Sequence, residues 1–123
     1  MVRPEFEITT RSRDGSIVLD LRGRIDASAN QDLSDAYVAA SDSGSATIVL
    51  NFAETVYINS TGIALLVGLL ARARAEGQSV LAYGLSDHYR EIFEVTRLAD
   101  FIELVSDEDS AVEPASRGVD PSG

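Results

Sequence analysis

The chain has 123 residues, enough for one domain with a modest core and too few for a substrate domain beside a cofactor domain. Its formal net charge of -10 argues against a nucleic-acid partner and against an anionic membrane surface, because both carry negative charge. The absence of cysteine excludes disulfides, thiol nucleophiles and cysteine metal sites, and it fits a reducing compartment.

The first elements expected are two strands joined by a tight turn. Residues 6–10 alternate apolar with polar side chains, which is typical of a half-buried strand. Asp14 and Gly15 predict a hairpin turn, because glycine adopts positive φ without strain. A second strand is expected over 17–21, with Gly23 ending it.

Helices and strands then alternate. Residues 28–31 match a capping box and predict the start of a helix. Residues 47–50 form a continuous apolar run, as in a buried central strand, and 51–59 is expected to be a loop. A long helix is predicted from Ser60 to a stop at Gly77. Its inner stripe is expected to consist of Ile63, Leu66, Val67, Leu70 and Ala71.

The last part of the chain predicts a strand at 80–83, a helix capped by Ser86 and a final strand within 101–105. From residue 106 the chain is acidic and lacks apolar periodicity, so 106–123 is expected to be a disordered tail beyond a domain at 1–105. Alternating strands and helices imply parallel pairing, and the opening hairpin makes the sheet mixed. We therefore expect a single α/β domain with a mixed four- to five-stranded sheet and helices packed against it.

The sequence contains no set of residues that predicts an enzyme. His88 is the only histidine, and alone it makes a weak metal site. The glycine-rich phosphate loops and the nucleophile elbow are missing, so we expect a protein-binding domain without a cofactor. The N-terminus lacks an apolar run like that of a signal peptide, and the longest apolar stretch, 63–71, is too short to span a bilayer. A cytoplasmic protein without direct membrane insertion is expected.

The segment from Tyr57 to Ile63 admits two interpretations. In the structural one, Asn59, Ser60 or Thr61 is simply the N-cap of the following helix. In the functional one, a hydroxyl at a helix start is accessible to a kinase, and the helix dipole and free N–H groups favour a phosphate there. A protein surface docked over that hydroxyl would meet a charge of roughly -2 after phosphorylation.

Residues 59–62, Asn-Ser-Thr-Gly, resemble the Asp-Ser-Ser/Thr-Gly signature of STAS domains, in particular of bacterial anti-sigma-factor antagonists. The likeness extends over 6–105. Residues 23–26 are similar to the family's Gly-x-Leu/Ile-Asp, 48–52 to its central strand and 63–77 to its long helix.

The resemblance implies a partner-switching mechanism. Members bind an anti-sigma factor that is also a serine kinase and so free the sigma factor for transcription. Phosphorylation by the kinase releases the antagonist, and a metal-dependent serine phosphatase resets the cycle. The matching phosphoacceptor is Ser60, with Thr61 as second choice, and Asp26 matches a carboxylate near the site.

The family usually has Asp before the acceptor, where this chain has Asn59. Asn can cap the helix but lacks the charge, so the rate of phosphorylation and the docking of a basic kinase surface are expected to differ. Leu65 and Leu69 lie on the flank of the apolar stripe and are interface candidates if they are exposed. The expected partner-binding residues are Asp26, Asn59, Ser60, Thr61, Gly62, Leu65 and Leu69.

Two further hypotheses stay open. The domain could be a STAS module that is never phosphorylated, acting as a scaffold or as an accessory subunit of a lipid-transport ATPase. A nucleotide-binding or nucleotide-hydrolysing enzyme is the third class, and the missing phosphate loop counts against it.

Overall fold

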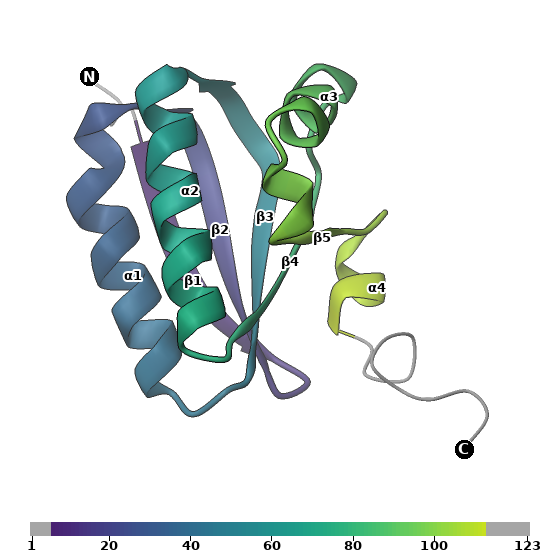
Figure 1. Ribbon diagram of the computed structural model, residues 1–123. Coiled ribbons are helices and arrows are strands. Elements are labelled where there is room, and N and C mark those ends of the chain that lie inside the picture. The colour runs from purple at the N-terminus through teal and green to yellow at the C-terminus, as the bar shows by residue number, and fades with distance from the viewer. Residues whose placement is uncertain (1–5, 113–123) are drawn as a thin grey trace.

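A computed structural model describes residues 6–112 and shows a five-stranded mixed sheet (Figure 1). The strands are β1 (Phe6–Arg13), β2 (Ser16–Ile25), β3 (Thr47–Ile58), β4 (Ser79–Tyr83) and β5 (Glu103–Leu104), and they lie side by side in chain order. β1 pairs with β2 in the antiparallel direction, and the remaining pairs are parallel. The expected α/β fold with a mixed sheet is thus confirmed.

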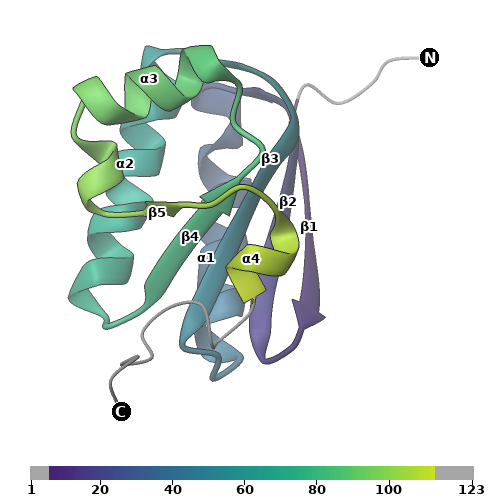
Figure 2. The same ribbon diagram turned by 90° about the vertical axis from the view of Figure 1, so that its right-hand side faces the viewer.

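Helices cover the two faces of the sheet unequally (Figures 1 and 2). The long helices α1 (Asn30–Asp42) and α2 (Ser60–Ala75) lie on one face, and the short α4 (Glu108–Val112) lies on the other. α3 (Asp87–Val95) follows β4, and 3-10 turns occupy Ala27–Ala29 and Leu98–Asp100. In residues 6–112 no helix is both long and apolar enough to cross a bilayer.

The burial pattern of β2 follows from this two-sided cover. All six residues from Ser16 to Leu21 are buried, because alternate side chains point to opposite faces. Ile17, Leu19 and Leu21 join the large core beneath α1 and α2. Val18 belongs to a separate small cluster beneath α4.

The structure corrects the prediction of a loop at 51–59. β3 continues to Ile58 because β2 also continues past Gly23 and provides a partner for it. Gly23, at φ +90°, sits where the register of this pair shifts, so it bends the second strand without ending it. The longer β3 brings the start of α2 to the far end of the sheet.

Three local predictions were also wrong. Residues 28–31 do not form a capping box. Asp26 caps the 3-10 turn Ala27–Ala29, and α1 follows with Ala29 at its N-cap position and no side-chain cap. In α2, Val67 and Ala71 are exposed. The buried residues of that helix are Gly62, Leu66, Leu69, Leu70 and Ala73.

The expected disorder from residue 106 does not hold for Glu108–Val112, which form α4. Ala111 and Val112 are buried there, and two apolar side chains are too few to give a recognisable periodicity in the sequence. Residues 113–123 of the expected tail lie outside the described residues.

Candidate functional site

The segment 59–62 lies where β3 ends and α2 begins, at the carboxyl ends of β2 and β3. Asn59 has an extended backbone, and its side-chain oxygen accepts a hydrogen bond of 2.8 Å from the N–H of Gly62. Of the three candidates, Asn59 is therefore the N-cap of α2. Ser60 is the first helical residue, and Ser60 and Thr61 are both exposed.

Gly62 is needed because α2 packs directly on the end of β2. A Cβ at this position would lie 2.1 Å from the carbonyl oxygen of Ile25 and 3.0 Å from Cγ2 of Ile58. The N–H of Asn59 donates to the same Ile25 oxygen at 3.2 Å. The glycine therefore fixes the helix start against the strand, so the position of Ser60 is set by backbone packing.

Asp26 follows Ile25 directly and lies beside this helix start. Its Oδ1 accepts hydrogen bonds from the Ser28 hydroxyl at 2.7 Å and the Ser28 N–H at 3.0 Å. These bonds, and to a smaller degree the charge of Arg24, hold the pKa of Asp26 below its ordinary value. The carboxylate is thus ionised at neutral pH and adds negative charge to the rim of the site.

A group of exposed side chains on β3 borders the site and was missed by the sequence analysis. Val56 is 71% exposed and Tyr57 41%, and the Arg24 guanidinium lies 4.7 Å from the centre of the Tyr57 ring. The predicted loop at 51–59 gave no indication that Val56 and Tyr57 lie together at the end of a strand. The N–H of Ile58 donates to the Tyr89 hydroxyl at 3.0 Å, which ties α3 to the same end of β3.

Leu65 and Leu69 have different environments. Leu69 is only 8% exposed and belongs to the main core, so it does not meet the condition of exposure on which its candidacy depended. Leu65 is half-buried and lines a groove of about 220 Å³ between α1 and α2, together with Ala64 and Gly68.

This arrangement can present a hydroxyl to another protein's active site. Ser60 is exposed at the positive end of a 16-residue helix, where first-turn N–H groups favour a phosphate. Within residues 6–112 no group of three or more His, Cys, Asp or Glu side chains could hold a metal ion. His88 is exposed in the first turn of α3.

Comparison with known proteins identifies the fold and the family. Residues 8–106 match the family model described as "Mlab, STAS domain". The anti-sigma-B factor antagonist of Listeria monocytogenes is 29% identical over 99 residues, which cover 80% of this chain and 86% of that protein. Residues 59–62 lie within the segment matched by the family model.

Two solved structures of SpoIIAA share the fold. The anti-sigma factor antagonist SpoIIAA in its unphosphorylated form gives a TM-score of 0.67 at 19% identity, covering 93% of this chain and 99% of that one. The Bacillus cell fate determinant SpoIIAA in the phosphorylated form gives 0.63 at 21% identity, covering 85% and 95%. With a family model matching most of its length, this chain belongs to the STAS domain family.

Proposed function

We propose that this protein is an anti-sigma factor antagonist switched by phosphorylation of Ser60. In its unphosphorylated state it binds an anti-sigma factor that is also a serine kinase, and so releases the sigma factor for transcription. Phosphorylation ends the complex, and a metal-dependent serine phosphatase restores the binding form. The curated relatives, named antagonists of an anti-sigma factor, support the binding role over that of a lipid-transport ATPase subunit.

The observation that carries the phosphorylation step is the exposed Ser60 hydroxyl at the first position of α2. A phosphate there gains about 0.3–1 kcal/mol from the helix dipole. The domain therefore remains folded after modification, and only the docked partner is affected. Thr61 is also exposed and is the second choice of acceptor.

The surface proposed to contact the kinase surrounds this hydroxyl. It consists of Asp26, Asn59, Ser60, Thr61 and Leu65, with Gly62 holding the helix start in place. A phosphate at Ser60 adds roughly two negative charges beside the Asp26 carboxylate, so a kinase surface that fits the unmodified site is repelled. Leu69 is left out because it is buried.

The test compares Ser60→Ala with its neighbour control Thr61→Ala in a reaction with the cognate kinase and ATP. We expect Ser60→Ala to abolish phosphate incorporation and to keep binding the kinase in the presence of ATP. Thr61→Ala should still be modified, with the phosphate mapped to Ser60 by mass spectrometry. Full incorporation into Ser60→Ala would contradict the proposal, as would a kinase complex that survives stoichiometric phosphorylation of the wild-type chain.

A further inference from the structure

The sheet face opposite α1 and α2 carries two rows of side chains, one apolar and one polar. Val18, Val49 and Leu81 lie next to one another on β2, β3 and β4 and are at most 1% exposed. The row beside them runs through Thr9, Asp20, Asn51 and Tyr83, which are paired across four strands. A sheet face that is simply buried in a core is usually apolar in every row.

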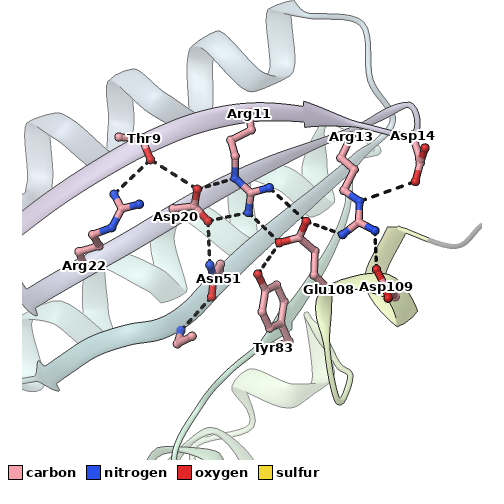
Figure 3. A network of polar contacts seen from close by, with 11 residues as sticks. Thr9, Arg11, Arg13, Asp14, Asp20, Arg22, Asn51, Tyr83, Glu108 and Asp109 are labelled. Carbon is pink, nitrogen blue, oxygen red and sulfur yellow. Dashed lines mark hydrogen bonds and ion pairs between the residues drawn. The ribbon is translucent and has the colours of Figure 1, made fainter.

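The helix α4 complements each row, and Figure 3 shows its contacts with the polar one. Ala111 and Val112 complete the apolar cluster of Val18, Val49 and Leu81. The Glu108 carboxylate reaches the polar row, where it accepts a hydrogen bond of 2.6 Å from the Tyr83 hydroxyl. The face therefore contacts both the apolar and the acidic side chains of the segment that covers it.

Two arginines of β1 supply the charge on this face. The Arg11 guanidinium donates to Glu108 at 2.7 and 3.1 Å and to the buried Asp20 at 2.6 and 2.9 Å. Arg13 donates to Glu108 at 2.6 Å and also pairs with Asp109. Arg11 and Arg13 thus place two guanidinium groups beside the apolar strip, each also paired with an acid outside α4, Asp20 and Asp14 respectively.

α4 is attached to the sheet by a small set of contacts. Of its described residues, 108–112, only Ala111 and Val112 are buried, so α4 adds little apolar area to the fold. The side chains of Arg11 and Arg13 are 41% and 36% exposed and that of Glu108 is 18% exposed, so water and salt weaken these ion pairs without abolishing them. Because α4 covers a small apolar cluster separate from the large core beneath α1 and α2, its opening would leave that core intact.

We propose that this face is a second docking surface, occupied in cis by α4 and open in trans to an acidic segment of a partner protein. The segment it fits has carboxylates, for Arg11 and Arg13, followed by small apolar side chains for the strip of Val18, Val49 and Leu81. Charge complementarity selects this partner, because removing α4 takes the Glu108 and Asp109 carboxylates away from Arg11 and Arg13 and uncovers the apolar strip. The inference does not depend on the phosphorylation of Ser60.

The first measurement is hydrogen exchange of the full-length wild-type chain. We expect the amides of 108–112 to exchange at least tenfold faster than those of β2 and β3, through an opening separate from global unfolding. Equal protection of α4 and the central strands would make α4 a fixed part of the core and would overturn the proposal.

The second measurement uses a full-length variant that releases α4. Val112→Asp places a charge against the apolar strip, and Val95→Asp makes the same change at a side chain that is already 70% exposed on α3. The probe is a fluorescent peptide with the sequence of residues 106–113, beside a second peptide whose acids are replaced by lysine. If Val112→Asp does not fold, the double variant Glu108→Gln, Asp109→Asn takes its place.

We expect the released variant to bind the acidic peptide at least tenfold more tightly than wild type or Val95→Asp, and the lysine peptide to bind to none of them. Arg13→Gln added to the released variant should weaken this binding. Peptide affinity equal in released and wild-type chains, with exchange showing α4 detached, would overturn the proposal. A dimer of the released variant that excludes the peptide would assign the face to a second copy and overturn the heterologous partner.

Discussion

Two glycines on α2 illustrate opposite roles of the same residue. Gly62 faces the Ile25 carbonyl so closely that a Cβ has no room, whereas a Cβ at Gly68 would meet no atom within 4 Å. We expect Gly62→Ala to lower the free energy of unfolding by about 2–3 kcal/mol, since overpacking forces the helix off the strand. Gly68→Ala should raise it by about 0.5–1 kcal/mol, because alanine is the better helix former.

Urea unfolding of the two variants beside wild type measures both changes, and Gly68→Ala serves as the matched control. A Gly62→Ala chain as stable as wild type would mean that α2 shifts without cost. The described close approach would then not be what positions Ser60.

Asn59 offers a second test at the level of one side chain. Replacing it with alanine removes the acceptor for the Gly62 N–H and should cost about 1 kcal/mol of stability. Asn59→Asp keeps an acceptor at the same place and adds a charge that suits the helix N-terminus, so it should not destabilise. Thermal unfolding distinguishes the two variants. An equal loss of stability in both would show that the hydrogen bond to the Gly62 N–H does not stabilise the helix start.

The individual elements show which parts of the structure could be predicted from sequence. Ser86 was correctly assigned as a cap, since it accepts from the N–H of Tyr89 and its signal is local. The extension of β3 to Ile58 was not predictable, because it depends on β2 continuing beside it after Gly23. The signature at 59–62 located the helix start, but the exposed pair Val56 and Tyr57 needed the strand to be recognised first.

The failure at α4 has a related cause. Local composition around Glu108 indicates a solvated acidic segment, and the partners that order it, Arg11 and Arg13, lie more than 90 residues earlier in the chain. Such a long-range pairing leaves no pattern in a short window of sequence.

The contact of α4 has a defined pH dependence. Arg11, then Tyr83, and less strongly Arg13 lower the pKa of Glu108 from 4.5 to about 2. Because the folded pKa is depressed, the contact contributes fully above pH 4.5 and is lost as the pH falls from about 4.5 to about 2. The NMR shift of the Val112 methyl groups should follow this window.

The same titration of Glu108→Gln serves as the control, since its side chain does not ionise. We expect a flatter curve for Val112 in that variant. An identical acid transition in both chains would assign the titration to another carboxylate.

At the scale of the whole molecule, salt should act in two directions at once. The net charge of -10 makes the folded chain repel itself, and added salt screens this repulsion and raises the unfolding midpoint. The exposed ion pairs of α4 are screened by the same ions, so the helix should loosen. Hydrogen exchange should therefore show α4 less protected, and β3 more protected, at about 1 M salt than at about 0.01 M salt. Parallel changes in both segments would contradict this account.

The length of β3 electrically isolates the two ends of the domain. Asn51 lies in the polar row beside α4, and Ile58 lies next to the start of α2, so at 3.3 Å per residue they are about 23 Å apart. That separation is nearly three times the screening length of about 8 Å at physiological salt. The charge of a phosphate on Ser60 is thus largely screened before it reaches Glu108. Phosphorylation of Ser60 at one end of β3 and opening of α4 at the other end can therefore occur independently of each other.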